Sequence, residues 1–110
     1  MLPDKVRIGA IDYDVKLADN MTPNSGNENG IVLGEIVYRK ALIYLSPDQN
    51  PQVMRQTLMH EIAHGILHQA GHYENDEAIV TALGYGLTAL IRGNPDLIRY
   101  IREDIHEANI

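Results

Sequence analysis

The residues with the clearest capacity for chemistry lie in one short segment, His60-Glu61-Ile62-Ala63-His64. Histidines four positions apart on a helix lie about 40° from each other around the axis and one turn along it, so both imidazoles can reach one metal ion. Glu61 projects about 100° away from His60, which suits a carboxylate that accepts a proton from water better than one that binds the metal. The spacing therefore predicts His60 and His64 as metal ligands and Glu61 as the catalytic base.

Zinc is the metal that these donors favour. The chain has no cysteine, and nitrogen and oxygen donors without a redox requirement suit Zn²⁺. Zinc lowers the pKa of a bound water toward about 7, and a neighbouring carboxylate can accept the proton and so produce a nucleophile for a carbonyl carbon. We therefore expect a zinc-dependent hydrolytic site. The alternative interpretation is an ordinary amphipathic helix with exposed histidines.

A catalytic zinc site usually has a third protein ligand, and Glu77 is the best candidate. It lies at the start of the next expected helix, where a short connection would bring its carboxylate back over His60 and His64. His68 lies too far along the first helix to share an ion with both histidines, and we expect it to face the negative end of the helix dipole. The alternatives to Glu77 that remain are His72, Glu74 and Asp76.

Two helices must position these side chains. Asn50 and Pro51 have the residue types of an N-cap and a first helical position, and apolar residues then recur at helical spacing until Gly71. A second helix is expected from residue 75 or 76 to residue 92. It contains a stripe of small residues, which are Thr81, Gly84 and Thr88. Gly84 is expected to allow close approach to the first helix. A third helix is expected from 94–95 to about residue 107.

Three strands are expected before the helices. Residues 5–17 have the pattern of one strand with a bulge at Gly9, and residues 31–38 and 41–45 that of a hairpin joined by Arg39-Lys40. Strands followed by helices indicate an α+β fold rather than an alternating α/β fold. The length of 110 residues fits one domain, which we assign to residues 1–110.

The charge distribution restricts the partners. A formal net charge of -6 disfavours binding to nucleic acid or to an anionic membrane surface. The 36 residues between Arg55 and Arg92 contain no Lys or Arg, and such a region suits a divalent cation. The longest mostly apolar run, 78–91, is too short to cross a bilayer, and the first residues lack the apolar core of a secretory signal. A soluble cytoplasmic protein is expected, and the sequence does not indicate its oligomeric state.

The segment from His60 to His68, followed by Asp76-Glu77-Ala78-Ile79-Val80, resembles the ImmA/IrrE group of zincin-like metallopeptidases, especially its short phage- and prophage-encoded members. Residues 34–38 and 41–45 resemble the strand pair that precedes the active helix in that group. The resemblance covers about residues 31–102. It implies a minimal zincin-like (gluzincin) fold with a small sheet of about three strands and three helices. It also implies zinc ligands at His60, His64 and Glu77, with Glu61 as the base.

Two functions remain open at this point. The first is a zinc-dependent endopeptidase whose protein or peptide substrate lies as an added strand along an exposed sheet edge, at residues 41–45 or 34–39. The second is a catalytically silent protein-binding module that zinc stabilises.

Overall fold

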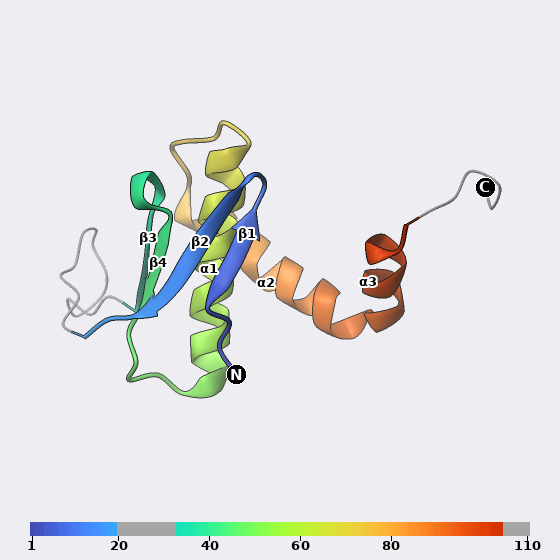
Figure 1. Cartoon of the computed structure of the whole chain (residues 1–110), viewed down its shortest axis with the longest axis horizontal. Coiled ribbons are helices and arrows are strands. Elements are labelled where there is room, and N and C mark those ends of the chain that lie inside the picture. The colour runs from blue at the N-terminus through green and yellow to red at the C-terminus, as the bar shows by residue number, and fades with distance from the viewer. Residues whose placement is uncertain (20–32, 105–110) are drawn as a thin grey trace.

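Four short strands and three α-helices build the described part of the chain, residues 1–19 and 33–104 of a computed structural model (Figure 1). The strands come first: β1 (Lys5–Ile8), β2 (Ile11–Leu17), β3 (Gly34–Val37) and β4 (Leu42–Leu45). The helices follow: α1 (Pro51–Gln69), α2 (Glu77–Gly93) and α3 (Pro95–Arg102). The fold is therefore α+β, as predicted, and it is compatible with a minimal zincin-like domain.

The prediction of one strand over residues 5–17 is wrong, because this segment folds into the hairpin β1–β2. Gly9 has a φ of +62°, and Ile8 pairs directly with Ile11 across a two-residue turn. A positive φ costs glycine little, so Gly9 reverses the chain where a bulge was expected. The sheet consequently has four strands in the described residues, one more than predicted.

The order of the strands is β1-β2-β4-β3. The predicted hairpin of the second half is confirmed as the antiparallel pair β3–β4, joined by a short 3₁₀ helix η2 (Tyr38–Lys40) and by Ala41 at a φ of 53°. β2 and β4 pair in parallel, which the sequence pattern did not indicate. As a result β4 lies inside the sheet, and β1 and β3 form its two edges among the described residues.

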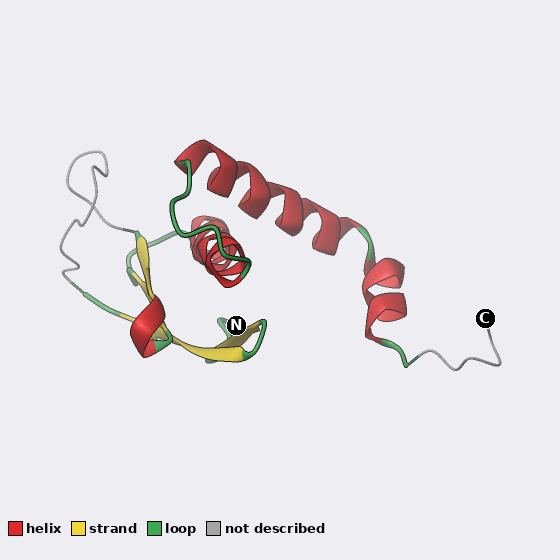
Figure 2. Ribbon diagram, turned by 90° about the horizontal axis from the view of Figure 1, so that it is seen from above, coloured by secondary structure: helices red, strands yellow, loops and turns green. Residues whose placement is uncertain are grey.

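Helix α1 covers one face of the sheet (Figure 2). The core lies between them and consists of six buried residues: Ile8, Tyr13, Val15, Ile43, Leu45 and Leu58. At Gly65 the helix approaches the sheet so closely that an added Cβ would lie 2.6 Å from Cδ1 of Ile8. The glycine that follows the histidine motif therefore sets how deeply α1 sits on the sheet.

The helix ends follow the sequence signals closely. The side chain of Asn50 accepts a hydrogen bond from the backbone N–H of Gln52 at 2.8 Å, and Gly71 adopts a φ of +93° just beyond α1. The predicted bounds of α1 and α2 are thus confirmed to within about two residues. Helix α3 ends at Arg102, so its predicted continuation through residues 103 and 104 is wrong, and the last residues predicted for it, 105–107, lie outside the described residues.

Helix α2 leads away from the sheet and carries α3 with it (Figure 1). No helix within residues 1–19 and 33–104 is long and apolar enough to cross a membrane.

Candidate metal centre

Three of the predicted site residues meet at one point between α1 and α2. Nε2 of His60 lies 3.0 Å from Oε2 of Glu77, and Nε2 of His64 lies 3.0 Å from Oε1 of the same carboxylate. One ligand atom from each residue falls within 4.8 Å of the others. The two histidines on α1 and the first residue of α2 therefore form a three-donor cluster.

Close packing of the two helices brings Glu77 to the histidines. A Cβ added at Gly84 would lie 3.4 Å from Cα of His60 and 3.4 Å from the carbonyl oxygen of Met59, so α2 crosses α1 nearly backbone to backbone. Val80, one turn after Glu77, is fully buried. The expectation that Gly84 allows close approach to the active helix is confirmed.

The N-cap of α2 explains which acidic residue faces the histidines. The carboxylate of Asp76 accepts a hydrogen bond from the backbone N–H of Ala78 at 2.8 Å, so it caps the helix. Glu74 and His72 lie in the connection and are exposed. Among residues 1–19 and 33–104, no group of three metal-binding side chains other than His60, His64 and Glu77 occurs.

The three donors fit zinc by their chemistry. Two imidazole nitrogens and one carboxylate oxygen are a donor set of catalytic zinc sites, which keep one position for water or substrate. Burial lowers the pKa of His64, against the opposing effect of Glu77, and the neutral imidazole is the form that binds a metal. The imidazoles are 25% and 18% exposed, whereas the Glu77 side chain is 68% exposed. The cluster thus has a shielded histidine side and an open carboxylate side.

Glu61 lies beside the cluster, buried under the edge strand, with an exposure of 7%. An added Cβ at Gly34 would lie 3.3 Å from Oε2 of Glu61 and 2.7 Å from Cγ2 of Thr57, so β3 rests directly on this carboxylate. Burial is the main cause that raises the pKa of Glu61 to about 8, and the charges of Glu77 and then Glu35 add to it. A carboxylate held in this way binds a proton readily near neutral pH, as a general base must.

His68 stays outside the cluster and contacts aromatic rings. Its imidazole stacks on the ring of Tyr38, with centroids 3.7 Å apart and an angle of 5° between the planes. The ring of Tyr73 meets the same imidazole edge-on, with centroids 4.9 Å apart and an angle of 70° between the planes. The absence of His68 from the three-donor cluster agrees with the helical geometry, while its aromatic partners were not predicted.

Two residues close to the site were missed in the sequence. Burial raises the pKa of Tyr38, and the charges of Glu61, then Tyr13 and then Glu77 add to this effect. Glu35 on β3 is the second. Both belong to the edge strand or follow it directly, so only the knowledge that β3 lies over α1 could have identified them.

The comparison with protein families agrees with this geometry. The family described as the IrrE N-terminal-like domain, peptidase M78, matches residues 17–82, which is more than half of the chain. The matched span includes β3, β4, α1 and the start of α2, and thus all four predicted site residues. The resemblance drawn from the motif is confirmed. No curated protein and no solved structure matched the chain.

Proposed function

Because the chain belongs to the IrrE N-terminal-like domain family of peptidases, we propose that it is a zinc-dependent endopeptidase acting on a protein substrate. The domain is of metallopeptidase type, and the zinc, the endopeptidase activity and the protein substrate are the proposed part. One observation carries the proposal: the donor atoms of His60, His64 and Glu77 converge within 4.8 Å beside the buried carboxylate of Glu61.

The metal would be held by His60, His64 and Glu77. When bound, zinc would supply a Lewis acid that polarises the scissile carbonyl and acidifies water. The approach of both carboxylate oxygens of Glu77 to the two imidazoles supports this assignment, because it brings one ligand atom of each residue within 4.8 Å of the others.

Glu61 acts as the general base and then as the general acid. Its carboxylate accepts the proton of the attacking water and donates it to the nitrogen of the leaving amine. The burial under β3 that raises its pKa supports this role, since the protonated form must last until the amine departs. The side chain packs against β3 at Gly34 and is not one of the three donors of the cluster.

The substrate lies as an added strand along β3. Of the two edges considered, residues 41–45 are excluded, because β4 pairs with β2 on one side and with β3 on the other. β3 is an edge strand of the sheet that residues 1–19 and 33–104 form, and it rests on Glu61 through Gly34. An extended peptide that hydrogen-bonds to β3 would therefore pass close to the base and to the metal ligands.

The test combines metal content with cleavage of an unstructured protein such as casein. Wild-type protein should bind about one zinc per chain, and Glu61→Gln should keep the zinc and lose cleavage. Glu74→Gln is the matched control, because Glu74 is exposed and outside the cluster. Metal-free native protein, or equal cleavage by Glu61→Gln, would contradict the proposal. Zinc binding without cleavage would favour the silent protein-binding module.

The source of the protein, its location in the cell and its partners are part of the same proposal. The resemblance to short members of the group supports a phage or mobile-element source and a cytoplasmic protein substrate. The net charge of -6 supports the expectation that neither nucleic acid nor a membrane is a partner.

A further inference from the structure

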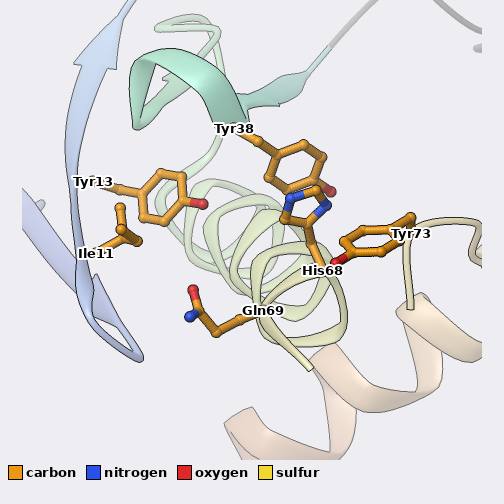
Figure 3. Close-up of a pocket in the computed structure, with 6 residues that line it drawn as sticks. All are labelled: Ile11, Tyr13, Tyr38, His68, Gln69 and Tyr73. Atoms are coloured by element: carbon orange, nitrogen blue, oxygen red, sulfur yellow. The ribbon is translucent and has the colours of Figure 1, made fainter. Parts of the chain in front are cut away.

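A pocket of about 320 Å³ opens beside the C-terminal end of α1 (Figure 3). It is bounded by the β1–β2 hairpin on one side and by η2 on the other. Its lining is mostly aromatic and contains no acidic or basic side chain apart from one imidazole: Ile11, Tyr13, Tyr38, His68, Gln69 and Tyr73.

The walls of the pocket are held in place by contacts among themselves. The His68 imidazole is stacked on Tyr38 and met edge-on by Tyr73, so three rings support one another. Opposite them, Tyr13 is only 3% exposed and belongs to the core. Figure 3 shows Tyr13 and Ile11 facing the Tyr38–His68 pair, with Gln69 between the two walls. The space is therefore shaped before a ligand enters.

The chemistry of the lining selects an uncharged, flat group. Aromatic faces and edges favour another aromatic ring, and Ile11 adds apolar surface. The hydroxyls of the tyrosines and the amide of Gln69 can bond a polar atom at the rim of such a ring. A carboxylate would find no lysine or arginine among the lining residues.

The pocket adjoins the metal centre. His68 follows His64 by one helical turn, a rise of about 6 Å, and continues the row of His60 and His64 along α1. Tyr38 follows the last residue of β3 directly. A peptide that lies along β3 and passes the metal ligands would therefore reach the pocket within two or three residues, at about 3.3 Å per residue.

We propose that this pocket binds an aromatic side chain of the substrate, located within three residues of the cleaved bond. The proposal rests on the proposed function, since it requires a peptide along β3. Antiparallel pairing is the more stable arrangement and places the N-terminal part of the peptide beside Tyr38. The aromatic residue is accordingly expected on the N-terminal side of the bond.

Binding can be measured without catalysis. N-acetyl-phenylalaninamide is titrated into zinc-loaded wild-type protein while ¹H–¹⁵N NMR spectra are recorded. Saturable chemical shift changes are expected at the backbone amides of Ile11, Gln69 and Tyr73. N-acetyl-alaninamide and N-acetyl-glutamate amide should bind with an affinity that is at least about tenfold lower. Shifts elsewhere, or equal affinity for the three compounds, would overturn the proposal.

Two variants test the pocket itself. Ile11→Trp fills it from a side chain that is 41% exposed, and Tyr73→Ala removes one wall at a residue that is 71% exposed. Because neither side chain belongs to the buried core, we expect both variants to fold. Both variants should bind N-acetyl-phenylalaninamide with an affinity that is lower by about tenfold or more. Ile101→Trp is the matched control, because Ile101 is an exposed isoleucine of α3 outside the pocket, and it should leave the affinity unchanged. An undiminished affinity in a folded pocket variant would refute the assignment.

A second measurement links the pocket to cleavage. A mixture of proteome-derived peptides is incubated with the wild type and the variants, and the cleavage sites are read by mass spectrometry. Aromatic residues should be enriched at one position before the bond, and Ile11→Trp should remove the enrichment while Ile101→Trp keeps it. Cleavage without an aromatic preference would overturn the proposed role of the pocket but would not affect the proposed peptidase activity. No cleavage at all would count against the peptidase, and the binding experiment would then decide the pocket separately.

Discussion

The Nε2 atom of His64 lies 3.0 Å from Oε1 of Glu77, although the two residues belong to different helices. The other oxygen of the same carboxylate lies 3.0 Å from Nε2 of His60. One side chain at the start of α2 thus completes a donor set that α1 begins. Because α2 is held against α1 at Gly84, the packing of two helices controls the assembly of the site.

Replacing Glu77 by glutamine should weaken zinc binding at least about a hundredfold. The amide keeps the size of the side chain but loses the negative charge and is a poorer ligand for zinc. The zinc affinity is measured by competition with a chromophoric chelator. Glu74→Gln, the exposed control in the connecting segment, should retain the wild-type affinity. Unchanged affinity in Glu77→Gln would reject Glu77 as the third ligand.

Removing zinc should lower the melting temperature. A ligand present at about 1,000 times its dissociation constant stabilises the folded state by about 4 kcal/mol, which for a domain of this size is a shift on the order of 10–20 °C. The midpoint is followed by circular dichroism before and after EDTA treatment and after zinc is restored. In His60→Ala, which loses one ligand, EDTA should have little effect. If EDTA does not change the thermal unfolding midpoint of the wild type, no metal contributes to its stability.

The size of residue 84 should decide whether the metal centre forms. An alanine Cβ would meet the backbone of α1 at 3.4 Å, an ordinary contact distance, so Gly84→Ala should keep zinc binding. Gly84→Leu should push α2 away from α1, destabilise the fold by about 1–3 kcal/mol and reduce zinc affinity. Chemical denaturation and zinc titration give both quantities. Gly86→Leu is the control, because an added Cβ at Gly86 meets nothing within 4 Å.

Gly34→Ala should reduce turnover more than zinc affinity. The new Cβ would lie 2.7 Å from Cγ2 of Thr57 and 3.3 Å from Oε2 of Glu61, so β3 or the base must shift. None of the three atoms nearest to that Cβ belongs to His60, His64 or Glu77, so these residues should keep their positions. The expected result is a lower kcat at near-normal zinc occupancy, measured with the substrate used for the wild type. Equal loss of zinc and turnover would show that the effect is general unfolding.

The stability of the metal-free protein should fall as the pH rises from about 4.5 to about 8. Burial raises the pKa of Glu61 in the folded state to about 8, against an ordinary value of 4.5, so the folded state binds this proton more tightly than the unfolded state does. The stabilisation is complete at a pH below the ordinary pKa of 4.5, and it is lost as the pH rises through the folded-state pKa of about 8. Over this range the effect is on the order of 3–5 kcal/mol.

Glu61→Gln isolates that effect, because His64 contributes in the opposite direction. The pKa of His64 is lowered in the folded state, so its contribution to stability is lost as the pH falls. The free energy of unfolding of wild type and Glu61→Gln, both treated with EDTA, is compared by urea titration at several pH values. The difference between them should change steadily with pH in the direction given above. A constant difference would show that Glu61 titrates at its ordinary pKa.

Local sequence signals determined the helices and two of the three donors in the His60, His64 and Glu77 cluster. The caps at Asn50 and Asp76 and the turn at Gly71 act within a few residues, so the bounds of α1 and α2 could be predicted. The i, i+4 spacing of His60 and His64 likewise follows from helix geometry alone. The α+β class followed from the order of strands and helices.

Only the tertiary structure decided the contacts between distant segments. The parallel pairing of β2 with β4, and hence the position of β3 at an edge of the described sheet, depends on segments that are far apart in sequence and have similar alternating patterns. The choice of Glu77 over Glu74 and Asp76 depends on how α2 crosses α1. The stacking of His68 on Tyr38 requires the end of β3 to meet the end of α1. Periodicity identifies which face of an element is buried, but the neighbour that covers it is set by packing across the whole domain.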